Sequence, residues 1–548
     1  MDVEILSRIQ FAFTVGFHFL FPPLTIGLGL NLVIMSALWL KTRNPLYHNM
    51  ARFWTRIFGV IFAVGVATGI VMEFQFGTNW ATYSRFVGDV FGSPLAIEGI
   101  YAFFLESGFL AILLFGWNKV GPKLHFFSTC MVALGSHFSA IWILVANSFM
   151  QTPAGYFLAK KVKVTEDGTQ HPLSANLAEG TYTVKEVPLP DDYVLQQADL
   201  TSVRAVIDNF WELVFSPSSM DRLIHTTLAC WLAGTFLVIS VSAYYLLRRK
   251  HVAFAKASMK IALIVASITA LLQLWSADST ARGVAENQPT KFAAMEGLAD
   301  STTDAPLGLG GIVTWERDAE GNRVGINESA LKIPGLLSIL VSGDFLNPGK
   351  GAQTEVKGLN DLPSDAFLQR RYPDKTPAQI ADVRPEYWPN VPVVFQTYHI
   401  MIACWGGIAL VAFLGLFLWW RGKLWQPEHS RFIRFFLWLC ILSIFLPQIA
   451  SQSGWFTAEM GRQPWVVYEI LKTSEALSEV VRANQVLTSL ILFGLIYFLL
   501  FLIFLYSLNS KIQHGPSEDL TGAELPEKWR PLSMKGGRME DVGKSPPQ

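Results

Sequence analysis

The sequence predicts an all-α integral membrane protein with about nine transmembrane helices in bundles, the N-terminus outside and the C-terminus in the cytoplasm. Of its 548 residues, 51% are of hydrophobic type and only 16% are charged, whereas a soluble domain carries about 25% charged residues. Nine apolar runs approach or exceed the length of about 20 residues that crosses a bilayer. Lys and Arg gather in alternate connections between these runs, which sets the orientation.

Two long polar segments divide the apolar runs into three groups. The nine predicted spans are 9–39, 55–75, 95–117, 125–147, 222–247, 258–276, 393–419, 432–451 and 484–508. We therefore divide the chain into helices one to four (1–147), an outer polar loop (148–221), helices five and six (222–276), a second outer polar loop (277–392), helices seven to nine (393–508) and a cytoplasmic tail (509–548).

The short connections predict which side of each helix faces the cytoplasm. The connections after helices one, three, five and seven hold Lys41, Arg43, Arg52 and Arg56; Lys119 and Lys123; Arg248, Arg249, Lys250 and Lys256; and Arg421, Lys423, Arg431 and Arg434. The connection between helices two and three offers only Arg85. By the positive-inside rule the basic connections are cytoplasmic, so both long polar segments lie outside.

Composition and motifs exclude several classes of function. The 43 basic and 43 acidic residues balance, so no basic excess suggests nucleic acid as a partner. The four cysteines stand singly, without the C-x-x-C spacing typical of zinc or iron–sulfur sites. No H-E-x-x-H or G-x-S-x-G motif occurs, so metalloprotease and serine-hydrolase functions lack a site. Asp2 and Glu4 replace the basic start of a cleaved signal peptide, so we expect the first apolar run to remain as an anchor.

Several ionisable or ligand-forming residues lie in or beside the predicted spans. A charge in hydrocarbon costs several kcal/mol, so such residues are functional candidates by default. They are His18, Glu98, Glu106, His137, His225, Met401 and, in the outer loop after helix eight, Glu459. The structural alternative for each is ordinary: a hydrogen-bonded core histidine, a packing methionine, or a carboxylate that is solvated near a helix end.

Two pairs of these residues occupy positions that together favour a chemical role. His225 and Met401 both fall just inside the outer ends of their helices, and a His and a Met across a bundle can hold a low-spin haem as its two axial ligands. Glu98 and Glu106 are eight residues apart, which in an α-helix separates them by about 12 Å along the axis and about 80° around it. That spacing suits a proton relay better than an acid–base pair acting on one substrate.

Four stretches of the sequence resemble a known family. These are LSRIQFAFTVGFHFLFPPLTIG in the first helix, IEGIYAFFLES in the third, GWFTAEMGRQPW after the eighth, and KFAAME at 291–296. In all four, and over nearly its whole length, the chain resembles subunit I of the cytochrome bd-type quinol oxidases.

The resemblance implies roles for individual residues. His225 and Met401 match the axial ligands of a low-spin haem b, and His18 and Glu459 match the ligands of a high-spin haem b and the oxygen-binding haem d, in an order left open. Arg462 and Trp455 match residues packed against the haems. Glu98, Glu106, Ser107 and Ser139 match the carboxylates and polar groups of the proton route. Lys291 and Glu296 match the quinol-binding pair, which makes 277–392 the quinol-binding loop.

The sequence departs from the family pattern in two places. The family often has an Arg two residues before the methionine ligand, where this chain has His399, which could tune or help hold the low-spin haem. That change resembles the cyanide-insensitive branch, in which haem b can replace haem d, so the oxygen-site haem stays open. Segment 148–221 is also longer than in familiar family members.

The resemblance implies an electrogenic terminal oxidase of the bacterial inner membrane. Quinol is oxidised at the outer face, and oxygen is reduced to water with cytoplasmic protons, without pumping. A second membrane subunit of similar size is implied as a partner, and small single-span subunits are compatible with it. Two alternatives remain: a proton- or ion-coupled transporter, which would be expected to show repeats with broken helices, and a haem subunit that only relays electrons.

Overall fold

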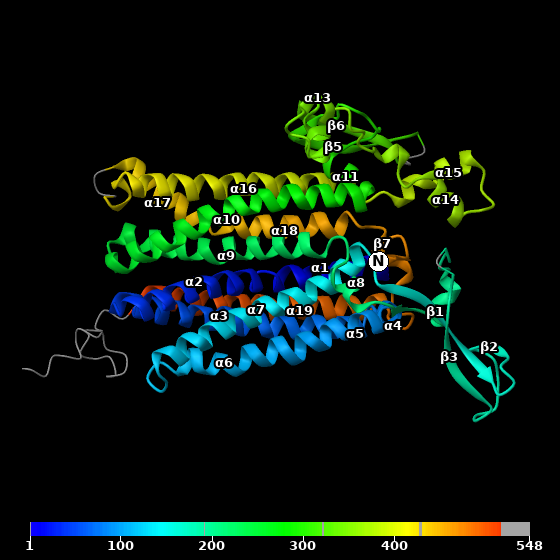
Figure 1. Cartoon of the computed structure of the whole chain (residues 1–548), viewed down its shortest axis with the longest axis horizontal. Helices are drawn as coiled ribbons and strands as arrows, with labels where there is room; N and C mark the ends of the chain where they lie inside the picture. The colour runs from blue at the N-terminus through cyan, green and yellow to red at the C-terminus, as the bar shows by residue number, and fades with distance from the viewer. Residues whose placement is uncertain (1, 191, 320–322, 427–429, 517–548) are drawn as a thin grey trace, which may run out of the picture.

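The chain folds into a long bundle of membrane-length helices with polar structure at one end (Figure 1). The computed structural model describes residues 2–190, 192–319, 323–426 and 430–516. Within them, nine helical segments are long and apolar enough to cross a membrane: Val3–Thr42, Pro45–Gly77, Ala81–Phe115, Pro122–Gln151, Ser219–Arg248, Val252–Asn287, Val391–Trp420, Arg431–Met460 and Ala483–His514. The prediction of nine spans is confirmed, and most helices extend past the predicted apolar runs into the polar segments.

Three of these segments are divided into shorter helices. The first is α1 (Val3–His18) and α2 (Pro22–Thr42); the third is α4 (Ala81–Phe86), α5 (Gly88–Ile97), the π-helix η1 (Glu98–Phe103) and α6 (Phe104–Phe115); the eighth is α17 (Arg431–Leu442) and α18 (Phe445–Met460). Pro22 and Pro23 start α2, where a missing N–H costs nothing, but they cannot continue α1. His18 is therefore the last residue of α1, beside this break.

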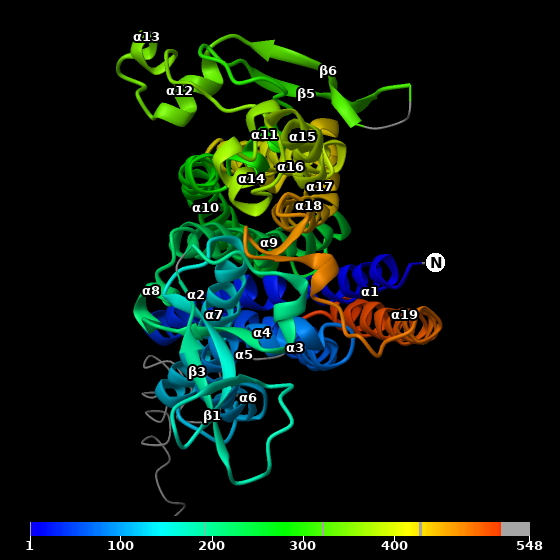
Figure 2. The same ribbon diagram turned by 90° about the vertical axis from the view of Figure 1, so that its right-hand side faces the viewer.

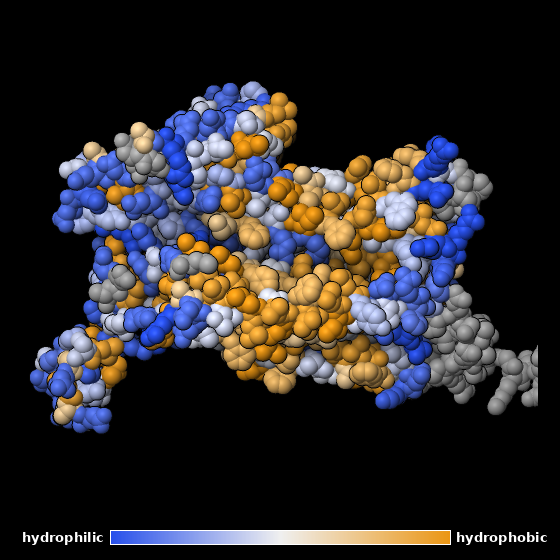
Figure 3. Space-filling view, turned by 180° about the vertical axis from the view of Figure 1, so that it is seen from behind, coloured by the Kyte–Doolittle hydropathy of each residue, from blue (hydrophilic) through white to orange (hydrophobic). Residues whose placement is uncertain are grey.

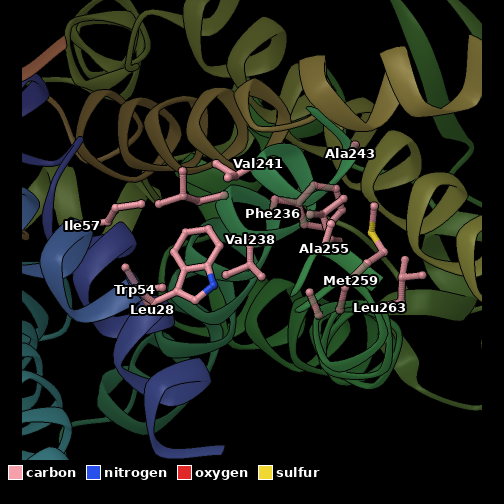
Figure 4. Close-up of a cluster of buried hydrophobic side chains, with 14 of the residues drawn as sticks. Leu28, Trp54, Ile57, Phe236, Val238, Val241, Ala243, Ala255, Met259 and Leu263 are labelled. Carbon is pink, nitrogen blue, oxygen red and sulfur yellow. The ribbon is translucent and has the colours of Figure 1, made fainter. Parts of the chain in front are cut away.

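The undivided spans complete the bundle and form its core. They are α3 (Pro45–Gly77), α7 (Pro122–Gln151), α9 (Ser219–Arg248), α10 (Val252–Asn287), α16 (Val391–Trp420) and α19 (Ala483–His514). Large apolar side chains of α2, α3, α9 and α10 meet in the largest buried cluster, where Trp54 packs among Leu28, Ile57 and Val238 (Figure 4). Glycine lets two helices approach closely here, because a Cβ on Gly27 would lie 2.0 Å from the carbonyl oxygen of Cys230.

Both long polar segments lie at the same end of the bundle, which we call the sheet end (Figures 1 and 2). The first holds an antiparallel sheet in which β1 (Tyr156–Thr165) pairs with β2 (Gln170–Pro172), β3 (Tyr182–Pro188) and β4 (Val203–Ile207). The second holds α11 (Pro289–Glu296) and the hairpin of β5 (Leu307–Arg317) and β6 (Arg323–Ile333). The short strands β7 (Trp465–Val467) and β8 (Leu471–Lys472) follow α18.

The sheet end also carries several short helices. They are η2 (Gln197–Thr201), α8 (Phe210–Val214), α12 (Leu336–Ser342), α13 (Pro348–Gly351), η3 (Leu359–Asp361), α14 (Asp365–Arg371), α15 (Pro377–Val383), η4 (Arg384–Tyr387) and η7 (Thr473–Glu475). The all-α prediction thus holds for the membrane part, but the polar segments contain strands that it did not include.

The opposite end, which we call the tail end, carries the basic connections and η5 (Lys423–Trp425). Figure 3 shows a band of apolar side chains between hydrophilic ends, as expected for a bundle crossing a bilayer. The predicted tail begins inside α19, which continues to His514, and its residues 517–548 lie outside the described part of the chain.

Candidate functional site

Glu459 lies at the sheet end of the bundle, in the last turn of α18. The sequence placed it in a loop after the eighth helix, and that placement is wrong, because α18 continues to Met460 through the polar run that ended the predicted span. Its carboxylate accepts hydrogen bonds from Asn147 Nδ2 at 3.1 Å and from Gln151 Nε2 at 3.2 Å, both on α7. Arg462 Nη2 pairs with its other oxygen at 2.5 Å.

Three basic side chains surround this one carboxylate. Besides Arg462, Arg222 from α9 donates to Asn147 Oδ1. Lys291 from α11 donates to Gln151 Oε1 and, at 2.6 Å, to Gln288 Oε1. Lys291 is only 2% exposed, and burial together with the guanidinium of Arg222 lowers its pKa well below the usual value. We call Arg222, Lys291, Arg462 and Glu459 the charge cluster; its two guanidinium groups alone outnumber its single carboxylate.

Several donors beside the charge cluster lack an acceptor. Among the described residues, Arg222 Nε, Arg462 Nε and Gln288 Nε2 are buried without a hydrogen-bond partner. Buried N–H groups are normally paired, so unpaired ones indicate an acceptor from a bound group. Together with the excess of positive groups, they suit an anionic ligand, such as a porphyrin with two propionate carboxylates.

His225 and Met401 come from helices on different sides of α18. The His225 ring lies beside Gln273 of α10, whose Nε2 is 3.0 Å from Nδ1 and 3.2 Å from Nε2. Met401 faces α18 at Gly454, where a Cβ would lie 2.8 Å from its sulfur. The thioether therefore packs directly against the Gly454 backbone, a place from which a larger residue would displace it.

His18 shows the same arrangement at the break between α1 and α2. Thr68 Oγ1 of α3 bonds its Nδ1 at 2.9 Å, which leaves Nε2 as the nitrogen that could bind a metal. A Cβ on Gly69 would lie 3.1 Å from the ring. Imidazole, thioether and carboxylate are all donors that iron porphyrins accept as axial ligands or close neighbours. With the unpaired donors above, the residues present fit haem.

Three further candidates, His399, His137 and Trp455, make contacts within the protein itself. His399 Nδ1 lies 2.8 Å from the Phe395 carbonyl and Nε2 lies 3.2 Å from the Gly308 carbonyl; a neutral imidazole donates to one of the two. His137 accepts from Trp231 Nε1 at 2.9 Å and bonds the Ala133 carbonyl at 2.7 Å, as a hydrogen-bonded core histidine does. Trp455 packs edge-on against Phe456.

The two carboxylates of the third span both face α7. Ser139 Oγ donates to Glu98 Oε1 at 2.5 Å, and Ser136 Oγ donates to Glu106 Oε1. The predicted angle of about 80° between them assumed a regular α-helix. The π-helix Glu98–Phe103 lies between them, and its wider turns change the angle around the axis. Ser107 Oγ donates to the Phe104 carbonyl of its own helix at 3.5 Å.

Lys291 and Glu296 lie on different faces of α11. Lys291 belongs to the charge cluster, whereas Glu296 lies against α16, where its carboxyl forms a side-chain hydrogen bond with Tyr398. Glu296 is 3% exposed, its Oε2 has no partner among the described residues, and burial raises its pKa to about 7.

The structure adds residues to these sites that were not predicted from the sequence, among them Ser136, Asn147, Gln151 and Arg222. Two signals could have revealed the last three. Arg222 is a charged residue at the first position of a predicted span, three residues before His225. Asn147 and Gln151 are four residues apart, and therefore share one face at the end of an apolar helix.

Comparison with known proteins gives the same assignment along the whole chain. A family model described as cytochrome bd terminal oxidase subunit I matches residues 6–516. The chain is 35% identical to cytochrome bd-II ubiquinol oxidase subunit 1 of Escherichia coli (strain K12), over 94% of this chain and 97% of that one. It is also 35% identical to cytochrome bd ubiquinol oxidase subunit 1 of Bacillus subtilis (strain 168), over 98% of each.

A solved structure agrees with the sequence comparisons. The bd oxidase from Geobacillus thermodenitrificans matches with a TM-score of 0.71 at 25% identity, covering 94% of this chain and 99% of that one. The family model, the relatives and the shared fold lead to one conclusion: this protein belongs to the cytochrome bd terminal oxidase subunit I family.

Proposed function

We propose that this chain is the haem-bearing subunit of a quinol oxidase of the bacterial inner membrane. It oxidises quinol at the outer face and reduces oxygen to water with protons from the cytoplasm. The single observation that carries the proposal is the charge cluster, because its excess of positive groups and its unpaired buried N–H donors call for an anionic cofactor at the outer end of the bundle.

The haems supply electron transfer and oxygen activation, and the chain supplies ligands, charge and proton groups. His225 and Met401 would hold a low-spin haem b. His18 and Glu459 would hold a high-spin haem b and the oxygen-site haem, d or b, in an order that the sequence leaves open. Arg222, Lys291 and Arg462 would neutralise carboxylates of these groups, and Trp455 would pack against them. Glu296 would accept a proton from quinol, in a site to which Lys291 contributes charge.

Protons for water formation would enter from the cytoplasmic side. Glu106 with Ser136, and Glu98 with Ser139, form two acid–hydroxyl pairs along α7; Ser107 follows Glu106 in the chain. Because quinol releases its protons outside and oxygen consumes protons from inside, charge is separated without a pump. The names of the relatives support quinol oxidation and a partner subunit; O2 and the lipid bilayer complete the system.

The visible spectrum of the purified protein, with its quinol-dependent oxygen uptake, tests this proposal. Low-spin and ligand-binding high-spin haem bands with oxygen uptake are expected. A protein without haem would instead be a transporter using Glu98 and Glu106. A protein with low-spin haem alone would be an electron relay, which would leave His18 and Glu459 without a role.

A further inference from the structure

The Glu296 carboxyl is enclosed by three elements that meet at the end of α11. Gly297, which ends α11 with φ +68°, shows how tightly they pack. A Cβ there would lie 3.0 Å from Glu328 Oε2 of β6, 3.2 Å from Val313 of β5 and 3.3 Å from Phe395 of α16. The preceding residue, Glu296, interacts with Tyr398 of α16 and Glu328 of β6, so its carboxyl lies between α16 and the β5–β6 hairpin.

Two hydrogen bonds fix the hairpin to α16 on either side of Tyr398. Gln396 Nε2 donates to the Gly311 carbonyl at 2.8 Å, and His399 Nε2 lies 3.2 Å from the Gly308 carbonyl. Between them, the partly buried Tyr398 directs its phenol at the Glu296 carboxyl. Oε2 of Glu296 is buried and has no hydrogen-bond partner among the described residues, so we assign the phenol to the other oxygen of the carboxyl.

Tyr398 also lies close to the candidate haem ligand on the same helix. Met401 is three residues further along α16, so the two side chains leave neighbouring turns on one side of the helix, about 4.5 Å apart along the axis. A substrate hydroxyl at Oε2 of Glu296 would therefore lie beside the helix that carries Met401.

We propose that Tyr398 is a positioning residue of the quinol site: its phenol holds one oxygen of the Glu296 carboxylate, so that Oε2 is free to take the proton of a quinol hydroxyl. In this step the quinol O–H bond breaks and an O–H bond forms at Oε2. The products are a quinolate anion and a neutral carboxylic acid, and Tyr398 keeps its own proton. The inference rests on the proposed function and adds a residue to it.

The groups facing Glu296 predict how the step depends on pH. The phenol of Tyr398 stabilises the carboxylate and so lowers the pKa of Glu296, whereas the negative charge of Glu328 raises it. Glu328 pairs with Lys332 on its own strand, and Lys291 lies on another face of α11. Only the carboxylate form accepts a proton, so quinol oxidation should rise with pH through the pKa of about 7.

The test uses the purified holo-oxidase and the rate at which a short-chain quinol reduces its haems, followed by stopped flow from acidic to alkaline pH. Tyr398→Phe should move the midpoint of the acidic limb upward by about one pH unit, since an ordinary hydrogen bond to a charged group corresponds to about one pKa unit. The rate should recover in alkaline buffer. Glu328→Gln should move the midpoint downward, and Glu296→Gln should remove the limb.

Two controls separate this role from a folding defect. Tyr245→Phe removes a buried phenol that bonds the Ile512 carbonyl at the tail end and should leave the profile unchanged. Reduction by an artificial one-electron donor and the haem spectrum should stay parental in Tyr398→Phe. A parental midpoint in Tyr398→Phe, or a loss of rate with both donors at every pH, would overturn the inference. A parental protein that lacks haem or does not oxidise quinol would instead refute the proposed function.

Discussion

At the scale of single residues, the candidate ligands are distinguished by what lies next to them. Met401 and His18 each pack against a glycine, where an added Cβ would lie 2.8 Å from the Met401 sulfur and 3.1 Å from the His18 ring. Glu459 is held by two amides and a guanidinium. The two glycines let the thioether and the imidazole lie directly against the neighbouring helix, and a side chain at either glycine would crowd the candidate ligand.

We expect Met401→Leu to remove the low-spin haem band while the protein still inserts and purifies. Leucine keeps the volume and the hydrophobicity, so only the sulfur ligand is lost. The reduced-minus-oxidised spectrum measures the change. Met259→Leu, at a fully buried position of the largest apolar cluster, is the matched control and should keep the band. An unaltered low-spin band in Met401→Leu would rule Met401 out as a ligand.

The sequence could predict candidate residues but not which of them meet. His225, Met401 and Glu98 stand out because polar or ligand-forming groups are rare in apolar runs. The charge cluster could not be predicted in this way, since Arg222, Lys291 and Glu459 come from three separate helices, α9, α11 and α18. Lys291 and Glu296 share a motif in the sequence, yet α11 directs them to different faces.

At the scale of elements, the length of each helix was harder to predict than its existence. α18 continues through Ser453 and Thr457, whose hydroxyls are buried, so polarity alone did not mark its end. The π-helix in the third span has no signature in the apolar pattern, and it changes the relative direction of Glu98 and Glu106. Strand β3 in the first polar segment lacks the alternation of apolar and polar residues that predicts a strand, because both of its faces are largely exposed.

The α6–α7 pair gives a prediction about the proton route. Glu106 is 7% exposed and bonded by Ser136, and Gly135 lets the two helices approach, because a Cβ there would lie 2.9 Å from Glu106 Cβ. Glu106→Gln should slow oxygen reduction roughly a hundredfold, the order expected for a lost acid–base group. Quinol should still reduce the low-spin haem, and Glu106→Asp should keep part of the activity.

Stopped-flow haem reduction alongside steady-state oxygen uptake measures both effects of Glu106→Gln. Ser136→Ala should show a weaker version of the same defect. Ser128→Ala, whose hydroxyl donates to the Leu124 carbonyl of α7, is the control and should behave as the parent. Oxygen uptake at the parental rate in Glu106→Gln would place the proton route elsewhere.

The α2–α9 contact gives a prediction about stability. Gly27 and Gly234 bring the two backbones together, and a Cβ at Gly27 would also lie 2.7 Å from the Gly234 nitrogen. Small residues at such crossings are what allow close helix packing in membranes. Gly27→Ala should therefore destabilise the protein by about 1–3 kcal/mol, the usual cost of overpacking.

Thermal unfolding in detergent, followed by size-exclusion chromatography, tests Gly27→Ala. Gly29→Ala is the matched control on the same helix, because its Cβ would make an ordinary contact, 3.5 Å from Ala133 Cβ. Both substitutions gain the same helix propensity, so their difference isolates the packing term. Equal midpoints for the two variants would contradict close packing of α2 on α9.

At the scale of the whole molecule, the chain places its chemistry asymmetrically. The charge cluster, Glu296 and both polar segments lie at the sheet end, whereas the basic connections lie at the tail end (Figure 1). Glu106 lies further along its span, toward the tail end, than Glu98 does. This order suits protons entering from the tail end and quinol protons leaving at the sheet end, provided that the sheet end faces outward.

We expect the sheet end to face outward, because the positive-inside rule assigns the basic connections to the cytoplasm. A single cysteine in place of the exposed Glu166, next to the turn between β1 and β2, should react with a membrane-impermeant maleimide in spheroplasts. A single cysteine in place of the exposed Lys119, between the third and fourth spans, should react only in inverted vesicles. The parental chain is the control, since Cys230, Cys404 and Cys440 are buried and Cys130 is partly so. The reverse labelling would put quinol oxidation on the cytoplasmic side. Protons would then be released and consumed on the same side, and the enzyme could not separate charge by the route proposed above.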